Sequence, residues 1–306
     1  MMMTVKKIGV IGLGQMGLPM SANLIQAGYK VIGYRRGDSS DFVALGGGLA
    51  ASAKDVAEQC DIVFSCIPDA VALEEIVCGP EGIIAVDCTG KILVELSTLA
   101  TADKLRQAEA LQRAGGRMLD GAISGLPAMV SAKSAVFFLS GDKGVFARIE
   151  DILPALSNKV FFMGEFGAAL ATKLCANMLV AINIAATAET IAFGRKAGID
   201  PLMLVAALRE GAGGSVQFSA RAERMATGNW HKVMGSTATL AKDIDLIQAK
   251  GKEVDFHLSL LSAISGIYQD ALEQGHGNHD VASIYAATAR KAGLTVPFYH
   301  ATALED

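Results

Sequence analysis

Short apolar runs alternate with longer amphipathic stretches along the first half of the chain. Residues 6–11 are expected to form the first strand, a helical pattern follows as far as Gly28, and residues 29–34 are expected to form the second strand. Strand, helix and strand therefore fit within about thirty residues, the length of a βαβ unit. The further strands that we expect cover residues 61–66, 83–86, 92–96, 117–119, 135–139 and 160–163. This alternation predicts an α/β domain with a doubly wound sheet.

Two helical patterns lie between the later strands. Residues 105–113 are amphipathic and end at the pair Gly115-Gly116, whereas residues 146–153 are expected to form a helix that ends at Pro154. Glycine and proline both mark helix ends, so each pattern has a stop signal of its own.

Long helical patterns replace the strands after residue 164. They cover residues 168–197, 201–210, 216–225, 237–250, 258–274 and 280–291. Asp200 precedes Pro201, and because Asp is a good N-cap and Pro suits the first helical position, a helix should begin there. Ser215 is expected to cap another helix. The second half of the chain is therefore predicted to be all helical.

The first strand runs directly into a glycine-rich turn. Its residues are Gly12, Leu13, Gly14, Gln15, Met16 and Gly17. In this pattern the first glycine permits the tight turn, the second lets the backbone approach a pyrophosphate, and the third lets the helix pack on the strand. The helix N-terminus attracts the anion, so we expect these six residues to bind a dinucleotide. A glycine-rich turn without a ligand is the weaker alternative, because all three glycines stand where the mechanism needs them.

These patterns together predict two domains. Residues 1–164 are expected to form a Rossmann-type domain that binds NAD(P), and residues 165–306 an all-α domain for substrate binding and dimerisation. The total of 306 residues leaves room for two cores of ordinary size.

The end of the second strand indicates which dinucleotide is bound. An acid at this position binds a free ribose 2′-hydroxyl, whereas an arginine accommodates a 2′-phosphate. The chain has Arg35 and Arg36 there, and its first acids, Asp38 and Asp41, come later. Two adjacent guanidinium groups favour a phosphate, so we predict NADP in preference to NAD, with NAD still possible. The alternative is that both arginines are solvated surface charges.

The composition of the chain indicates a folded protein that associates with copies of itself and does not bind nucleic acid. Hydrophobic residues make up 51% of the chain and charged residues only 19%, which excludes disorder and suggests extra buried surface, as in a homodimer or homotetramer. The formal net charge of −4, without a basic run, gives no reason to expect nucleic-acid binding. The five cysteines form no CxxC pair, so reduced thiols in a cytoplasmic protein are expected.

Two further features resemble a membrane span and a metal site. Residues 174–193 are long and apolar, but polar residues such as Asn183 and Glu189 interrupt them, which favours a buried helix over a membrane span. His276 and His279 lie in a glycine-rich connection without supporting cysteines or acids, so no metal site is predicted.

Two segments carry candidate chemistry. Ser124 and Gly125 follow a strand of the sheet, where a hydroxyl and backbone N–H groups can hold a carboxylate, although an ordinary surface loop explains them equally well. Lys173 and Asn177 lie four residues apart, on one face of an otherwise apolar helix. Burial lowers the pKa of a lysine towards neutrality, which suits proton exchange with a hydroxyl or carbonyl oxygen. A snorkelling lysine beside a satisfied amide is the alternative.

Four segments in order along the chain resemble the β-hydroxyacid dehydrogenase family, which includes 3-hydroxyisobutyrate dehydrogenases and tartronate semialdehyde reductases. They are GLGQMGLPM at residues 12–20, DGAISG at 120–125, the spaced glycines, lysine and asparagine of 164–177, and LAKD at 240–243. The resemblance spans nearly the whole chain.

The resemblance implies a role for each matching residue. Ser124 and Gly125 would hold the substrate carboxylate, Lys173 would transfer the proton, and Asn177 would order the substrate oxygen. Lys242 would lie near the nicotinamide and the substrate. Ser97 and Thr98 would lie near the nicotinamide ribose, and Ile67 and Pro68 at a strand end that faces the cofactor.

The departures from the family pattern limit the choice of substrate. Leu126 stands where a second glycine is usual, and Ala176 where the family often has asparagine, which implies an altered substrate pocket. The 6-phosphogluconate branch usually has a histidine at the position of Ala176 and a longer chain, so that substrate is set aside.

The expected function is an NADP-preferring dehydrogenase or reductase, with NAD possible, that interconverts a small β-hydroxy acid and its semialdehyde or keto form by hydride transfer, with Lys173 as general acid and base. An imine or keto-acid reductase is one alternative, although imine reductases usually replace the lysine that this chain keeps as Lys173. A non-catalytic dinucleotide-binding protein is the other alternative.

Overall fold

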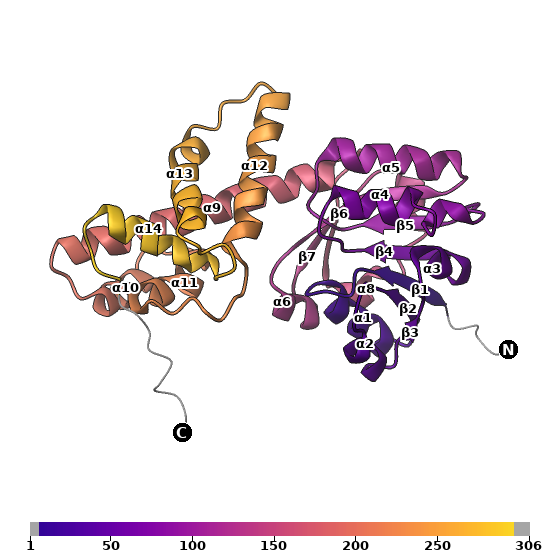
Figure 1. The fold of residues 1–306 in the computed structure, drawn as a ribbon, viewed down its shortest axis with the longest axis horizontal. Coiled ribbons are helices and arrows are strands. Elements are labelled where there is room, and N and C mark those ends of the chain that lie inside the picture. The colour runs from indigo at the N-terminus through magenta and orange to yellow at the C-terminus, as the bar shows by residue number, and fades with distance from the viewer. Residues whose placement is uncertain (1–5, 297–306) are drawn as a thin grey trace. The chain divides into compact units, whose positions relative to one another are not determined.

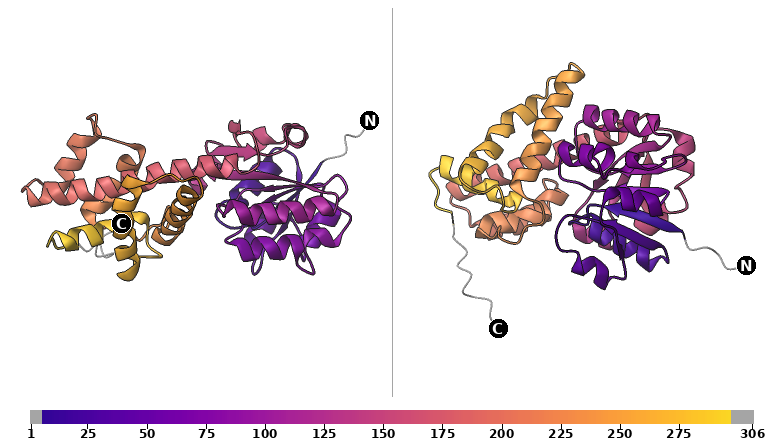
Figure 2. Two further views of the ribbon diagram at one scale, coloured as in Figure 1. Left: turned by 90° about the horizontal axis from the view of Figure 1, so that it is seen from above. Right: turned by 45° about the vertical axis from the view of Figure 1, so that its right-hand side comes forward.

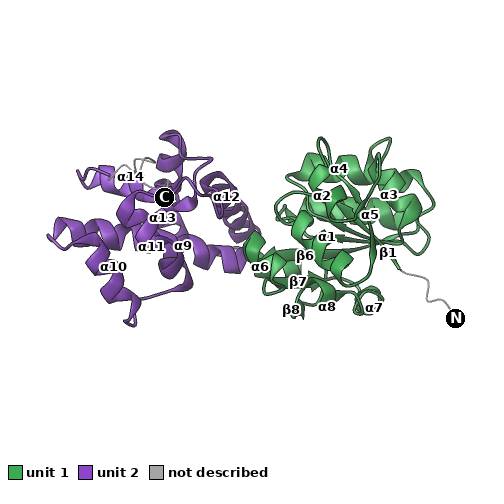
Figure 3. Ribbon diagram, turned by 90° about the horizontal axis from the view of Figure 1, so that it is seen from below, with its two compact units in different colours: residues 1–173 green, residues 174–306 purple. Residues whose placement is uncertain are grey.

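A computed structural model describes residues 6–296 of the chain. The chain divides into two compact units, residues 1–173 and residues 174–306 (Figure 3). The division falls inside a long helix, α9 (Ala168–Lys196), nine residues after the expected boundary at residue 164.

The first unit contains one eight-stranded sheet in the order β3-β2-β1-β4-β5-β6-β7-β8 (Figure 1). Neighbouring strands are parallel except for β6 and β7, which are antiparallel. The strands are β1 (Lys7–Ile11), β2 (Lys30–Tyr34), β3 (Gly48–Leu49), β4 (Ile62–Ser65), β5 (Ile92–Glu95), β6 (Arg117–Ser124), β7 (Val136–Ser140) and β8 (Lys159–Phe162). The strand order reverses between β1 and β4, and the crevice at such a point is where open α/β sheets bind ligands.

Helices cover both faces of the sheet (Figures 1 and 2). They are α1 (Gly17–Gln26), α2 (Ser40–Ala44), α3 (Ala53–Gln59), α4 (Ala70–Cys78), the 3-10 helix η1 (Ile83–Ala85), α5 (Thr101–Arg113), α6 (Pro127–Ser131), α7 (Lys143–Ala147) and α8 (Leu153–Leu156). Neighbouring residues of β1 belong to two different hydrophobic cores, one on each face of the sheet, because side chains alternate along a strand. Val10 packs with Leu24 of α1, whereas Ile11 belongs to the cluster that contains Leu73 of α4. The predicted Rossmann-type domain is confirmed.

Two expectations for this unit are wrong. Residues 83–86 form no strand but the short helix η1, in which the N–H of Ala85 donates to the carbonyl of Gly82 at 3.2 Å. A short apolar run has no periodicity that separates strand from helix. The single helix expected over residues 146–153 is absent, and two short helices, α7 and α8, lie in this region. Pro154 lies in the first turn of α8 and does not follow the C-terminal end of a helix. Proline is tolerated there because the first N–H groups of a helix have no intrahelical acceptor.

The second unit is helical. Its elements after α9 are α10 (Pro201–Arg209), α11 (Val216–Thr227), α12 (Thr237–Glu253), α13 (Ser259–Glu273), the 3-10 helix η2 (Val281–Ser283) and α14 (Ile284–Lys291). The predicted caps form, since Asp200 accepts from the N–H of Met203 and Ser215 from the N–H of Phe218. Between residues 174 and 296 the only β pairing is an isolated bridge between Ser236 and Asp280.

The helix α9 is the one described helix whose length and composition would suit a membrane span, and 44% of its apolar window is buried within the protein. Core helices of globular domains share this composition. The hydroxyl of Tyr268 on α13 donates to the carbonyl of Ala181 at 2.8 Å, so the part of α9 in the second unit packs against α13.

Candidate active site

The glycine turn adopts the conformation that its sequence predicts. Gly12 has φ +90°, and a Cβ atom there would lie 2.0 Å from the carbonyl oxygen of Cys66. A Cβ at Gly17 would lie 2.0 Å from the carbonyl oxygen of Gly12. Both positions therefore require glycine, one for the turn and one for the close approach of α1 to it.

Gly14 differs from the other two glycines, because a Cβ there would meet nothing within 4 Å. The space on the side of its missing Cβ is therefore open to a ligand. The first turn of α1 contains no acid and no side-chain cap, so its N–H groups can bind an anion. The shape of the turn is compatible with a dinucleotide pyrophosphate, and its binding residues remain a prediction.

This contrast between glycines gives a test of the turn. Gly14→Ala is expected to leave folding intact and to weaken dinucleotide binding about tenfold or more, because the methyl group would occupy the space of the pyrophosphate. Gly12→Ala is expected to lower stability instead, because its methyl group meets backbone. Cofactor titration and thermal unfolding of both variants separate the effects. Unchanged affinity in the folded Gly14→Ala protein would contradict a pyrophosphate at this turn.

A pocket of about 430 Å³ lies beside the turn, within the first unit. Its walls include the carboxyl ends of β1, β2 and β4, which places it at the point where the strand order reverses. It brings together three pairs of predicted cofactor residues, namely Gly12 and Gly14, Arg35 and Arg36, and Ile67 and Pro68. Ser52, Ala72, Glu75 and Glu81 also line it and were not singled out by the sequence.

Other predicted cofactor residues are placed as follows. The side chain of Leu13 is fully buried in the core, so only its backbone can face a ligand, while Gln15 is exposed and Met16 half-buried. Thr98 follows β5 and is half-buried.

The two arginines after β2 have different surroundings. Arg35 Nη2 lies 2.5 Å from Asp41 Oδ1, and Arg35 Nη1 donates to the carbonyl of Leu13 at 2.6 Å. Arg36 has a side chain that is 70% exposed, and its Nη1 lies 3.8 Å from Glu75 Oε2. Arg35 therefore braces the glycine turn, whereas Arg36 extends from the pocket wall with only a distant, solvent-screened partner.

The predicted substrate and catalytic residues lie at the end of β6, in the loop that follows it, and on α9. Ser124 is the last residue of β6, and Gly125 and Leu126 lead into α6. Lys173 lies in the second turn of α9 and is half-buried. Asn177 follows one helical turn later on the same helix.

In the second unit, Asp243 on α12 joins two of the predicted residues. Asn177 Nδ2 donates to Asp243 Oδ2 at 2.6 Å, and Lys242 Nζ lies 3.1 Å from Asp243 Oδ1. An ionised carboxylate only accepts hydrogen bonds, so the amide nitrogen of Asn177 must face Asp243 and the amide oxygen must point elsewhere. Asp243 was noticed in the sequence only as part of the LAKD segment, and its orienting contact was missed.

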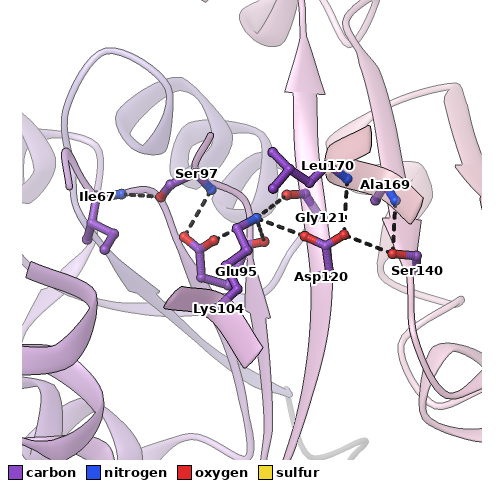
Figure 4. Close-up of polar contacts among 9 residues, drawn as sticks. All are labelled: Ile67, Glu95, Ser97, Lys104, Asp120, Gly121, Ser140, Ala169 and Leu170. Atoms are coloured by element: carbon purple, nitrogen blue, oxygen red, sulfur yellow. Dashed lines mark hydrogen bonds and ion pairs between the residues drawn. The ribbon is translucent and has the colours of Figure 1, made fainter. Parts of the chain in front are cut away.

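A buried ionic cluster beside the sheet was also missed (Figure 4). Lys104 Nζ lies 2.9 Å from Glu95 Oε2 and 2.9 Å from Asp120 Oδ1, and all three side chains are 0% exposed. Burial lowers the pKa of Lys104, but the two carboxylates more than offset burial, so the pKa is raised and the ammonium stays charged. The available sequence signal was a lysine on the inner face of an amphipathic helix.

The histidines of the glycine-rich connection pack as rings. His276 Nδ1 and His279 Nδ1 lie 2.9 Å apart, and the ring of Trp230 packs edge-on against His276. Burial, followed by His279, lowers the pKa of His276. Between residues 6 and 296, no three His, Cys, Asp or Glu side chains are grouped to hold a metal ion.

Comparison with known proteins places the chain among dehydrogenases. A family model described as the NAD binding domain of 6-phosphogluconate dehydrogenase matches residues 7–164. A second model, described as NAD-binding of NADP-dependent 3-hydroxyisobutyrate dehydrogenase, matches residues 167–288.

Individual proteins agree with the family models. The chain is 26% identical to 2-(hydroxymethyl)glutarate dehydrogenase of Eubacterium barkeri, over 95% of this chain and 97% of that protein. It is 28% identical to 2-hydroxy-3-oxopropionate reductase of Escherichia coli, over 92% of this chain and 96% of that protein. A crystal structure of 3-hydroxyisobutyrate dehydrogenase from Salmonella typhimurium superposes with a TM-score of 0.84 at 25% identity, covering 92% of this chain and 99% of that one.

Fold and site together define an oxidoreductase that uses a nicotinamide dinucleotide and acts on a hydroxyl group. The chain belongs to the β-hydroxyacid dehydrogenase family. The predicted family, fold and enzyme class are thereby confirmed, while the individual site residues remain predictions.

Proposed function

We propose that the protein interconverts a small β-hydroxy acid and its semialdehyde or keto form, with NADP(H) as the preferred cofactor. The observation that carries the proposal is the pair Lys173 and Asn177, one turn apart on α9, with the Asn177 amide oriented by Asp243. A proton-transferring amine and an oriented amide are what a carbonyl reduction needs beside a dinucleotide site. The names of the relatives from Eubacterium barkeri and Escherichia coli support this substrate class.

The residues divide the reaction between them. The bound dinucleotide supplies or accepts the hydride at the carbinol carbon. In the reductive direction Lys173 Nζ donates a proton to the carbonyl oxygen as that oxygen gains charge, and in the oxidative direction it accepts the hydroxyl proton. Asn177 positions this oxygen. Ser124 and Gly125 hold the substrate carboxylate through hydrogen bonds. The ammonium group of Lys242 attracts the same carboxylate by its positive charge.

The cofactor preference rests on the division of roles between the arginines. Asp41 and the Leu13 carbonyl engage Arg35, whereas Arg36 is the exposed guanidinium on the pocket wall and the better ligand for a 2′-phosphate. Arg36→Ala is expected to weaken NADPH binding about 10- to 100-fold, the value of one or two charge-assisted contacts, and to leave NADH binding nearly unchanged. Fluorescence titration with both cofactors measures this.

Arg113→Ala provides the matched control, because Arg113 is an exposed arginine at the end of α5, away from the lining of the pocket. It should bind both cofactors as the wild-type protein does. Equal losses of NADPH and NADH affinity in Arg36→Ala would show that Arg36 does not read the 2′-phosphate.

The proposed activity is tested by a spectrophotometric screen at 340 nm. NADPH and NADH are each offered with C3 to C5 semialdehydes, and the corresponding hydroxy acids are offered in reverse with the oxidised cofactors. We expect turnover with at least one acid–semialdehyde pair, and faster turnover with NADP(H). Binding of cofactor without turnover across the panel would favour a non-catalytic dinucleotide-binding protein.

An imine or keto-acid reductase is the second candidate, and Leu126 and Ala176 favour it, because both stand at family positions usually occupied by other residues. Leu126 is the residue that immediately precedes α6, next to the predicted carboxylate-binding pair. Cyclic imines and 2-keto acids are added to the same screen. Activity on imines together with inactivity on hydroxy acids would decide for this candidate.

We further propose a cytoplasmic homodimer or homotetramer. Two bulky apolar side chains of α9, Leu179 and Phe193, are 60% and 74% exposed. Charged residues make up only 19% of the chain, which also favours extra buried surface of the kind that association between copies provides. Light scattering of the purified protein gives the oligomeric state.

A further inference from the structure

The buried cluster of Glu95, Lys104 and Asp120 is the charged feature that the proposed mechanism does not use. It lies wholly within the first unit and joins α5 to β5 and β6. Taking charges out of water is costly, and a buried ion pair adds little or no stability compared with apolar residues of the same size. Stability alone therefore does not explain three buried charges at this place in the fold.

One end of the cluster holds the start of α9 (Figure 4). Asp120 Oδ2 accepts from the N–H of Leu170 at 3.0 Å and from Ser140 Oγ at 2.9 Å. Ser140 Oγ in turn accepts from the N–H of Ala169 at 3.0 Å. Asp120 and Ser140 thus cap α9 from distant strands and satisfy donors that a helix start leaves without intrahelical partners. Lys173 lies in the next turn of this helix.

The other end of the cluster holds two loops that follow β4 and β5. Glu95 Oε1 accepts from the N–H of Ser97 at 2.9 Å, and Ser97 Oγ accepts from the N–H of Ile67 at 2.8 Å. Ile67 lines the cofactor pocket, and Ser97 precedes Thr98, which the family resemblance places near the nicotinamide ribose. The cluster therefore reaches from the predicted cofactor loops to the helix that carries the predicted proton donor.

Lys104 connects the two ends. Its Nζ lies between the carboxylates and also donates to the carbonyl of Gly121 at 2.8 Å. Because both carboxylates approach the same ammonium group, the position of one fixes the position of the other. Without the ammonium group, two buried like charges would face each other and move apart.

We propose that Lys104 is a positioning residue for the reaction, which holds Glu95 and Asp120 so that the loops at Ile67 and Ser97 and the start of α9 keep one fixed geometry. The inference rests on the proposed function, in which Lys173 transfers the proton. Lys104 itself is fully buried and acts through the two carboxylates. The active-site contribution of this cluster is geometric, since a small misplacement of a reacting group costs far more in turnover than in binding.

The test compares three variants and one control variant with the wild-type protein. Lys104→Met keeps the length of the side chain and removes its charge. We expect it to lower kcat about 30-fold while changing the Kd for NADPH by no more than about threefold, because the glycine turn and Arg36 provide most of that affinity. Adding Glu95→Gln to Lys104→Met restores the formal charge of the cluster to that of the wild type and keeps an oxygen for the N–H of Ser97. This double variant should recover at least part of the lost kcat.

A second single variant, Ser140→Ala, tests the proposal even if Lys104→Met fails to fold. Ser140→Ala leaves all three charges in place and removes one hydroxyl, which accepts from the N–H of Ala169 and donates to Asp120 Oδ2. We expect kcat to fall about fivefold with wild-type cofactor affinity. Arg106→Met is the matched control, since Arg106 is an exposed cation on the same helix that pairs with Asp103. It should turn over as the wild type does.

Hydrogen exchange measured by mass spectrometry gives a readout that needs no substrate. Lys104→Met should speed exchange in peptides that contain the amides of Ile67, Ser97, Ala169 and Leu170, and Glu95→Gln should reverse the change. Wild-type kcat in Lys104→Met, or a lower melting temperature with unchanged kcat per folded molecule, would overturn the positioning role. Absence of turnover in the wild-type protein across the substrate screen would instead refute the proposed function.

Discussion

Lys173→Ala is expected to lower turnover about a thousandfold, within the 10²- to 10⁴-fold range of general acid–base catalysis, while NADPH affinity stays nearly intact. The amine is the proton donor in our mechanism, and it lies on α9 rather than on the glycine turn or in the lining of the proposed cofactor pocket. Losing it removes an interaction made in the transition state and leaves cofactor binding alone. Steady-state kinetics and cofactor titration of the same preparation measure both quantities.

Lys196→Ala is the matched control, because Lys196 is an exposed lysine at the other end of α9. Its turnover should equal that of the wild-type protein. Turnover of Lys173→Ala within about threefold of the wild type would refute the proton-transfer role, because that role accounts for at least 10²-fold. A parallel loss of cofactor affinity would show instead that the substitution disturbs the first unit.

Asp280→Ala is expected to destabilise the helical unit by about 3–5 kcal/mol, the cost of removing one partner of a buried ion pair. Asp280 is fully buried, 3.6 Å from Arg221 Nε and 3.7 Å from Arg224 Nη1. It also accepts from the N–H groups of Met234 and Ala282. Burial lowers the pKa of Arg221 and Asp280 partly offsets this, so the substitution leaves the buried Arg221 charge without its carboxylate counter-ion and several N–H groups without their acceptor.

The chain contains a built-in reporter for this experiment. Trp230 is the single tryptophan, is 6% exposed, and accepts through its carbonyl from the N–H of Asp280 at 3.0 Å. Urea unfolding followed by its fluorescence reports on the helical unit. Glu253→Ala, which removes an exposed acid paired with Lys250, should change the unfolding free energy by less than about 1 kcal/mol. A similarly small change in Asp280→Ala would mean that Asp280 adds no net stability.

Features of the fold that depend on neighbours along the chain were predictable. The turn at Gly12, the cap at Asp200 and the cap at Ser215 all form as expected. The caps use contacts within a few residues, and the turn depends on the backbone conformation that glycine permits. The expectations that proved wrong, residues 83–86 and 146–153, concern short segments. In such segments apolar periodicity is too brief to separate strand from helix, and proline both starts and ends helices.

The candidate site was only partly predictable. The glycine turn and the residues Arg35, Arg36, Ile67 and Pro68 were identified in advance and line one pocket. The different roles of the two arginines were not, because they depend on which of them reaches Asp41. The contact between Asp243 and Asn177 was not predictable either, since it joins helices whose residues are 66 positions apart.

The amino-acid sequence by itself determined most of the helices and strands and the glycine turn, because hydrophobic period, backbone conformation and local capping act over short distances along the chain. The class of protein followed from the resemblance of four short segments to a known family. Only the tertiary structure decided which charged groups meet inside the protein. Lys104 lies 16 residues from Asp120, and Asp120 lies 50 residues from the N–H of Leu170 that it caps. These contacts depend on strand order and on the exclusion of water, because a charge removed from water needs a partner that only the folded chain provides.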